Sequence, residues 1–302
     1  MDFNSWNIVW SLCFGLLAIL IIVGNLLTIW IFLKRRLRKR AHFLLVSLAV
    51  ADLLIGLIPV PLYIAVNTAL CFGQLLGSSL SEFTDIFTGI ASISTLAAIS
   101  LERMYAIGWP FPHRNLNFRV DMFAIAIPWI VTSIFTSIRL LLYLSIITLK
   151  AFMYCLILFL STPLLVMCIA YFVAWRKQKT MMGNRNHVVR ETRLAKTLLI
   201  ITAASLLTWL PFQTLNLLAI RGELGGFPKA NMTFNIIKFL QFSNSLVNVI
   251  IYPFRITEFK NGLLQILRCW ASSRNRRNEV VPMHQGRLRQ LHHRQELHIP
   301  NH

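Results

Sequence analysis

Seven long apolar runs constrain this chain more than any other feature of its sequence. They cover residues 8–33, 42–66, 79–108, 120–144, 149–175, 192–220 and 233–253. A helix that crosses a bilayer needs about 20 apolar residues, and only helices and closed barrels satisfy all backbone polar groups in lipid. Runs of this length exclude strands. The sequence therefore predicts an all-α membrane protein, a seven-transmembrane helix bundle over residues 8–253.

The basic residues predict how this bundle is oriented, and they argue against a nucleic-acid partner. The net charge is +19, but the cations cluster in the connector at 34–40, before the sixth run and in the C-terminal tail. The alternate connectors carry few cations, mainly Lys150, Arg221 and Lys229. Because cations concentrate on the cytoplasmic side, we expect a multi-pass plasma-membrane protein with a short extracellular N-terminus at 1–7.

The chain beyond the seventh run divides into two parts. In residues 254–270, Phe259, Leu263, Leu264 and Leu267 fall on one side of a helix and basic residues on the other. This pattern predicts an amphipathic eighth helix on the membrane surface. Within it Cys269 is a candidate palmitoylation site, or a plain thiol. Residues 271–302 are polar and basic, and we expect a disordered cytoplasmic tail. On the other side of the membrane, Asn231 begins a glycosylation sequon.

The third run carries Asp85 near one end and the pair Glu102-Arg103 near the other, and charge within lipid is costly. Asp85 and Arg103 are 18 residues apart, which places them on one helix face and roughly 27 Å apart along the axis. That separation is close to the thickness of the hydrocarbon core. We expect a carboxylate near one membrane surface and a guanidinium near the other.

A second polar group is spread over three runs and predicts a hydrated pocket. A buried carboxylate needs donors or a cation, and sodium is the natural candidate for oxygen ligands. The alternative is hydrogen bonding between helices without an ion. No other cofactor is expected. The residues of this candidate metal site are Asp52, Ser92, Asn244 and Asn248.

Prolines mark candidate hinges in the fifth and sixth runs. Pro163 and Pro211 each remove a backbone donor, and Trp209 lies beside the second proline, where its movement would repack the helix. Glu191 is 18 residues before Trp209, so it shares that face and can pair with Arg103. The alternative is a solvated glutamate.

These residues and spacings resemble the rhodopsin-like (class A) G-protein-coupled receptors across nearly the whole chain up to Trp270. The matching motifs are Gly24-Asn25, the LAVAD run ending at Asp52, ISLERMYAI with Glu102-Arg103, Trp129, Pro163 followed by Tyr171, TWLPF, and NSLVNVIIYPFR. The resemblance implies a receptor and not an enzyme, with a heterotrimeric G protein as its partner. It assigns coupling and switching to Glu102, Arg103, Pro110, Phe111, Tyr171, Glu191 and Tyr252.

The chain departs from the family pattern at several positions. The motif NPxxY reads NVIIY here, Met104 replaces the usual tyrosine after Arg103, and Ser78 stands where a cysteine usually tethers the outer loop. The connector near residues 143–150 is too short to form a lid over the bundle. Basal activity and the outer architecture are therefore open questions at this stage.

The near absence of an extracellular domain predicts a ligand site in the outer cavity of the bundle, for a small molecule or short peptide. Asp85 matches the carboxylate by which amine receptors hold an ammonium group. Lys238 can neutralise that carboxylate internally or extend to the surface. The candidate ligand-binding residues are Asp85, Gly89, Cys155, Trp209, Phe212, Gln213, Asn216, Lys238 and Phe242.

Three ligand classes follow from the resemblance. We rank an amine or other cationic small molecule first. The end of the seventh run and Asn216 resemble adenosine receptors, and the short outer loop resembles melanocortin-type receptors, so these rank second. Outside the receptor class, a transporter is the main alternative, but the sequence lacks the internal repeats and broken helices of a transporter.

Overall fold

The computed structural model of the chain describes residues 3–34, 40–68, 74–180, 185–222, 230–255, 259–266 and 268. Within these ranges the regular secondary structure is helical, and no strand occurs. The chain separates into two units, Met1–Arg255 and Ile256–His302. The first unit holds the bundle, and residues 259–266 of the second are helical within the range predicted for the eighth helix. Cys269 and the tail at 271–302 lie outside the described residues.

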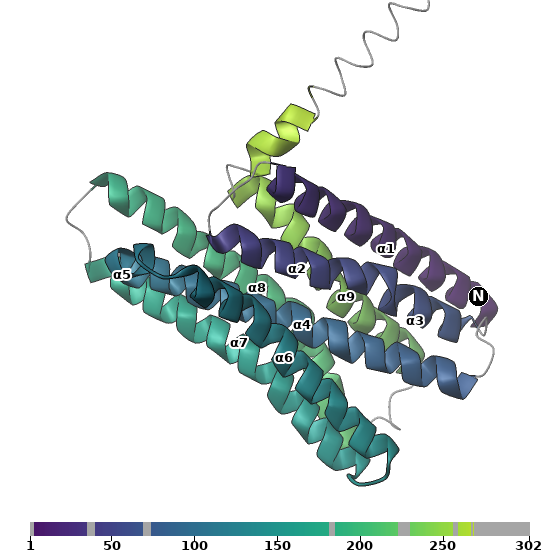
Figure 1. Ribbon diagram of the computed structural model, residues 1–302. Helices are drawn as coiled ribbons and strands as arrows, with labels where there is room; N and C mark the ends of the chain where they lie inside the picture. The colour runs from purple at the N-terminus through teal and green to yellow at the C-terminus, as the bar shows by residue number, and fades with distance from the viewer. Residues whose placement is uncertain are drawn as a thin grey trace, which may run out of the picture. The chain divides into compact units, whose positions relative to one another are not determined.

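The bundle confirms the predicted all-α architecture. Its described helices supply seven segments long and apolar enough to cross a membrane, and Figure 1 shows their arrangement. The helices are α1 (Phe3–Lys34), α2 (Arg40–Leu57), α3 (Pro59–Asn67), α4 (Gln74–Gly108), α5 (Pro110–Arg114), α6 (Phe118–Tyr143), α7 (Leu149–Thr180), α8 (Arg185–Arg221) and α9 (Ala230–Arg255).

The second predicted run is divided into two helices, which corrects the single helix expected over 42–66. The division falls at Ile58, because Pro59 begins α3 and proline has no backbone donor to continue a helix. Two backbone bonds of 3.0 Å, from Ile58 N to Leu54 O and from Leu62 N to Ile58 O, still join the two helices. Together they form one membrane span, His42–Asn67.

Several helices extend beyond the apolar runs that predicted them. α1 begins at Phe3 and takes in most of the segment at 1–7, while α7 continues to Thr180 and α8 begins at Arg185. Hydropathy marks only the part of a helix that fits the hydrocarbon core. Lysine, arginine and glutamine are good helix formers, so the polar ends of α7 and α8 remain helical.

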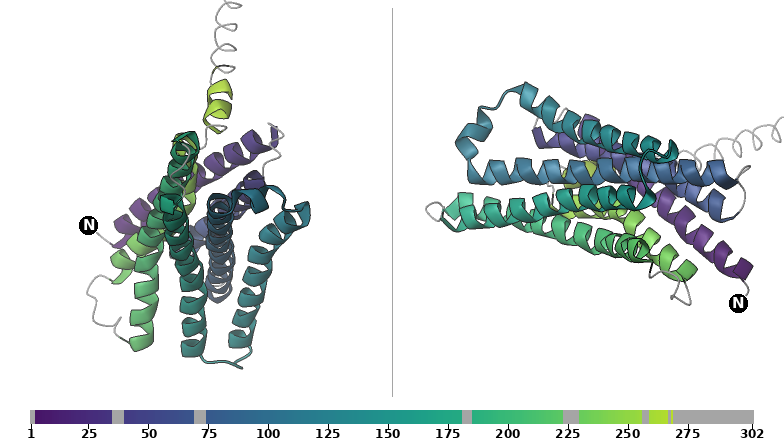
Figure 2. Two further views of the ribbon diagram at one scale, coloured as in Figure 1. Left: turned by 90° about the vertical axis from the view of Figure 1, so that its left-hand side faces the viewer. Right: turned by 90° about the horizontal axis from the view of Figure 1, so that it is seen from below.

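Helix α4 has the most neighbours in the bundle. It packs against α2, α3, α6, α7 and α8, and Figure 2 shows it among them from two further directions. Side chains on several of its faces therefore meet protein and not lipid. This position explains how α4 can carry Asp85 and Ser92, both buried, within a membrane-spanning segment.

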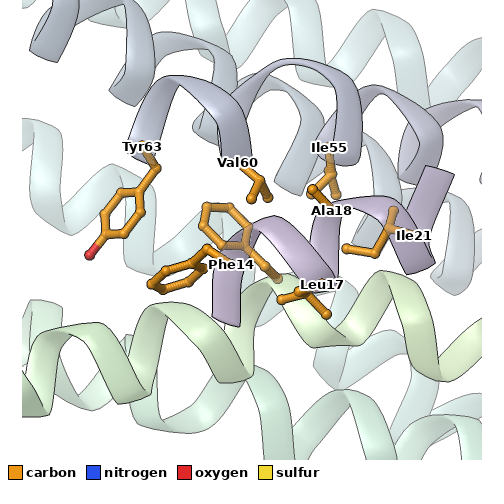
Figure 3. Close-up of a cluster of buried hydrophobic side chains, with 8 residues drawn as sticks. Phe14, Leu17, Ala18, Ile21, Ile55, Val60 and Tyr63 are labelled. Atoms are coloured by element: carbon orange, nitrogen blue, oxygen red, sulfur yellow. The ribbon is translucent and has the colours of Figure 1, made fainter. Parts of the chain in front are cut away.

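An apolar cluster joins α1, α2, α3 and α9, and Figure 3 shows its side chains. Its residues Phe14 and Leu17 belong to the first half of α1, and we call the end of the bundle where α1 begins the N-terminal end. Phe14 lies at its centre, with ring centroids 4.9 Å from Tyr63 and 6.1 Å from Phe242. The Tyr63 hydroxyl donates a hydrogen bond of 2.6 Å to Asn235 Oδ1. These contacts hold α9 against α1 and α3, and they fix the position of Phe242.

Candidate functional site

Three buried polar side chains meet near the N-terminal end of the bundle. Asp85 comes from α4, and Lys238 and Gln241 come from α9. Lys238 Nζ lies 2.5 Å from Asp85 Oδ2 and 3.1 Å from Gln241 Oε1. Gln241 Nε2 donates to Asp85 Oδ1 at 3.1 Å. Each member of this group, which we call the Asp85 triad, is therefore bonded to the other two.

The triad decides between the two alternatives that the sequence left for Lys238. Its side chain points inward to Asp85 and is only 9% exposed, so extension to the membrane surface is wrong for this structure. Gln241 follows Lys238 by three residues and thus lies on the same face of α9. The buried ion pair of Asp85 and Lys238 offsets the cost of desolvating its two charges only when the remaining polar atoms of the pair are also bonded. Gln241 supplies those bonds.

Aromatic rings surround the ammonium group of Lys238. Its Nζ lies 4.4 Å from the ring centroid of Phe212, 5.7 Å from that of Phe242 and 5.9 Å from that of Phe234. A cation within about 6 Å of an aromatic face is attracted by the ring quadrupole. The predicted ligand residues Phe212 and Phe242 are thus placed beside Lys238 by α8 and α9.

One face of α8 presents further buried polar atoms, and Gln213 on this face donates from Nε2 to Ile157 O and Ser161 Oγ of α7. Trp209, Gln213 and Asn216 recur at helical spacing and are all buried. Trp209 Nε1, Gln213 Oε1 and Asn216 Nδ2 have no hydrogen-bond partner among the described residues. Buried polar atoms normally have partners, so these three are candidates for contacts with a ligand.

Gly89 on α4 gives Trp209 its place. A Cβ atom at Gly89 would lie 3.0 Å from Trp209 Cη2 and 4.0 Å from Gln241 Nε2. The absence of a side chain therefore lets the indole ring approach α4 beside the triad. Cys155, the remaining predicted ligand residue, is partly buried on α7, and the contacts described for the triad do not include it.

A second polar cluster surrounds Asp52 on α2, which is fully buried. Ser92 Oγ of α4 donates to Asp52 Oδ1 at 2.6 Å, and Asn248 Nδ2 of α9 donates to Asp52 Oδ2 at 2.9 Å. Three of the four residues predicted for a sodium pocket therefore meet. We call this group the Asp52 cluster.

The fourth predicted residue, Asn244, is bonded elsewhere. Its Oδ1 accepts a hydrogen bond of 3.2 Å from Thr208 Oγ1 of α8, and its Nδ2 has no partner in the described part of the chain. A carboxylate with hydroxyl and amide oxygens is the donor set of a hard cation. These residues fit sodium in their chemistry, and the ion itself stays a prediction.

At the opposite end of the bundle, Arg103 forms an ion pair with its neighbour in the chain. Arg103 Nε pairs with Glu102 Oε2 of its own helix at 3.2 Å, and its side chain is 27% exposed. Glu102 Oε1 lies 3.0 Å from His113 Nε2. The Glu191 side chain lies outside the described residues, so its pairing with Arg103 stays a prediction.

The structure also describes four other predicted coupling residues. Pro110 begins α5 and Phe111 follows it with 80% of its surface exposed. Tyr171 of α7 packs with Met104 against Ile107 and Ala174, and Tyr252 of α9 is buried. A partner protein at this end would thus meet an exposed aromatic side chain on the α4–α6 connection.

A cavity of about 480 Å³ lies near this opposite end, between α4, α6 and α7. Its lining is mostly apolar and includes Ala97, Phe123 and Pro163, with Glu102 and His113 among the polar residues. It does not include the residues predicted to bind the ligand. We therefore build the candidate ligand site on the Asp85 triad and the α8 face, and not on this cavity.

Sequence reasoning missed three residues of these sites. Gln241 could have been found, because its spacing from Lys238 puts an amide on the same helix face. Thr208 and His113 gave no such signal, since each bonds a residue of another helix, Asn244 and Glu102 respectively. Such pairings depend on how the helices pack.

Comparison with known proteins identifies the family. The 7 transmembrane receptor (rhodopsin family) matches residues 24–252. Adenosine receptor A3 of Ovis aries is 27% identical and covers 89% of this chain and 94% of its own length. Histamine H2 receptor of Cavia porcellus is 28% identical over 95% of this chain and 87% of its own length. Adenosine receptor A2a of Canis lupus familiaris is 27% identical over 83% of this chain and 70% of its own length.

The family match covers residues 24–252, and the described helices supply seven segments that could cross a membrane. The chain therefore belongs to the rhodopsin family of 7 transmembrane receptors: it is a multi-pass plasma-membrane protein and a class A G-protein-coupled receptor, not an enzyme.

Proposed function

We propose that this receptor binds a small ligand at the N-terminal end of its bundle, facing the outside of the cell. It then activates a heterotrimeric G protein through movement of α8 at the opposite end. The Asp85 triad and the polar face of α8 support the first part. The unpartnered buried atoms of that face, including Trp209 Nε1, belong to α8, so a ligand that bonds them contacts the helix that is proposed to move. The partly exposed Arg103 and the exposed Phe111 support the second.

For the ligand, the geometry favours a neutral molecule that forms hydrogen bonds, such as a nucleoside. The observation that carries this is the set of unpartnered buried atoms, Trp209 Nε1, Gln213 Oε1 and Asn216 Nδ2. They offer two donors and one acceptor. The Asp85 charge is balanced by Lys238, so an added cation is not required. The two adenosine receptors among the relatives agree with this class.

An amine is the second candidate, which reverses the order expected from sequence. Asp85 is a buried carboxylate beside aromatic rings, and histamine H2 receptors are among the relatives. An amine would have to replace Lys238 at Asp85, however. That exchange leaves a buried ammonium without its partner, which is costly.

A reconstituted receptor separates the two ligand classes. The measurement is guanine-nucleotide exchange on a heterotrimeric G protein, with adenosine and histamine as the probes. We expect adenosine to raise the exchange rate and Asn216→Ala to weaken that response at least tenfold, since the variant loses its amide donor. A response to histamine that Asp85→Asn abolishes would establish the amine class instead.

The coupling assignment is tested at the opposite end. Arg103→Ala should abolish nucleotide exchange, while Arg119→Ala, which removes an exposed arginine at the start of α6, should leave it within about twofold. Thermal unfolding of both variants controls for folding. Full exchange by a folded Arg103→Ala receptor would contradict the proposed role of Arg103.

A further inference from the structure

The surroundings of Lys238 have the chemistry of a cation-binding site. They combine the carboxylate of Asp85, the amide oxygen of Gln241 and the aromatic rings of Phe212, Phe234 and Phe242. A carboxylate with several aromatic faces is how proteins hold organic ammonium ions. In this receptor, an ammonium group of the chain itself is already there.

The lysine satisfies this site. An ammonium group has three donors, and Lys238 Nζ gives one to Asp85 Oδ2, one to Gln241 Oε1 and has the Phe212 ring 4.4 Å away. Asp85 Oδ1 is also occupied, because it accepts from Gln241 Nε2. Both charges are buried. An external cation therefore finds no unbonded carboxylate oxygen within the triad.

We propose that Lys238 is an intramolecular ligand: its ammonium group fills a cation-binding site made by Asp85, Gln241 and the three rings, and its removal creates a site for short primary alkylammonium ions. The assignment goes beyond the proposed receptor function and does not depend on it. It predicts that simple amines do not bind at Asp85 while Lys238 is in place.

Tethering gives Lys238 a large advantage over a free amine. A tethered group competes with an effective concentration in the millimolar range or above, and its departure would leave Asp85 buried without a cation. Lys238→Ala removes this competitor. The substitution deletes Cγ, Cδ, Cε and Nζ, the four heavy atoms of n-propylammonium, and leaves Asp85 in need of a positive charge.

The test is a titration of the purified full chain in detergent, followed by thermal unfolding. The probe is n-propylammonium chloride, with sodium chloride as the ionic-strength control and 1-propanol as an uncharged molecule of similar size. A ligand that binds only the folded state raises the unfolding temperature. We expect Lys238→Ala to unfold at a lower temperature than the wild type. Millimolar n-propylammonium should restore much of this loss, and 1-propanol should not.

Two matched variants show where the ion binds. Lys238→Arg keeps a cation in place, so it should ignore n-propylammonium as the wild type does. The double variant Asp85→Asn with Lys238→Ala lacks the carboxylate, so it should also fail to respond. If either variant responds at all, its midpoint concentration should be at least about tenfold higher than that of Lys238→Ala.

Two results with Lys238→Ala would overturn the proposal. One is an equal response of wild type and Lys238→Ala, which would mean that the lysine does not fill the site. The other is a folded Lys238→Ala chain that binds no n-propylammonium. If this variant does not fold, Lys238→Met keeps most of the side-chain volume without charge. Lys238→Met should destabilise the wild-type chain but have little effect on a chain that already carries Asp85→Asn. A similar loss of stability in both chains would refute the assignment. Because the readout needs neither agonist nor G protein, it fails or succeeds separately from the proposed function.

Discussion

Asp52 and Asp85 are two buried carboxylates that this bundle stabilises in different ways. Asp52 accepts hydrogen bonds from two neutral groups, the hydroxyl of Ser92 and the amide of Asn248. Asp85 is paired with a cation, Lys238, and with the amide of Gln241. In both cases α9 supplies a partner. The difference is that the described contacts of Asp52 leave its charge unbalanced, whereas those of Asp85 balance it.

This difference suggests two kinds of regulation within one bundle. A carboxylate held only by neutral donors can attract a mobile cation, because hydrogen bonds spread its charge without cancelling it. A carboxylate paired with a lysine of its own chain needs no such ion. We therefore expect the Asp52 cluster to respond to the ionic composition of the medium and the Asp85 triad to be insensitive to it.

The largest effect should come from Lys238→Asp, which places two carboxylates side by side in the triad. Breaking a buried pair and leaving an uncompensated charge costs about 3–5 kcal/mol, so we expect severe loss of folded receptor. The swapped pair, Asp85→Lys with Lys238→Asp, should regain most of it. Thermal unfolding and surface expression measure both. Lys150→Asp, at an exposed lysine, is the control, and a Lys238→Asp variant as stable as that control would contradict the buried pair.

The next prediction separates the two carboxylates by their response to sodium. Replacing choline chloride by sodium chloride should stabilise the folded wild type by about 1–3 kcal/mol when the sodium concentration is well above its dissociation constant. Asp52→Asn should abolish this gain, since the amide carries no charge, and Asp85→Asn should retain it. The unfolding temperature in the two salts is the measurement. Equal sodium dependence in both variants would show that Asp52 is not the ion's ligand.

A smaller effect is expected for Gln241→Leu, which removes the amide that joins Asp85 and Lys238. The variant leaves a donor and an acceptor of the triad unsatisfied, at a cost of about 1–3 kcal/mol. Ser243→Ala is the matched control on the same helix, because its exposed hydroxyl bonds only the carbonyl of Leu240 among the described contacts. If the two variants unfold within about 0.5 kcal/mol of each other, Gln241 is not part of the triad's stabilisation.

The smallest effect concerns Gly89, which lies between the triad and Trp209. Gly89→Ala brings a Cβ to 3.0 Å from Trp209 Cη2, so the indole must shift, at a cost of about 1 kcal/mol. Gly15→Ala in α1 has nothing within 4 Å of the added atom. It should be neutral or slightly stabilising, because alanine favours a helix over glycine. Chemical denaturation compares the two, and a Gly89→Ala variant as stable as Gly15→Ala would mean that Trp209 has room to move.

Much of the fold followed from the sequence, because lipid imposes a simple rule. Apolar runs of bilayer length must become helices, and the seven spans were predicted on that ground alone. The polar helix ends were missed because the rule does not apply to them: Arg185 and Thr180 lie in helices where hydropathy gives no signal. The break at Ile58 could have been predicted from Pro59, since proline's effect is local.

The polar residues divide in the same way. Charged side chains are costly in lipid, so the positions of Asp52, Asp85 and Lys238 within apolar runs mark them as functional. Spacing along the chain also predicts which residues share a face of the same helix. Which groups pair across helices depends on the rotation and depth of each helix in the packed bundle. That is why Lys238 could have reached either Asp85 or the surface, why Asn244 bonds Thr208 instead of Asp52, and why His113 meets Glu102. A charge buried in lipid demands a partner, and only the packing of α4, α8 and α9 selects which one it receives.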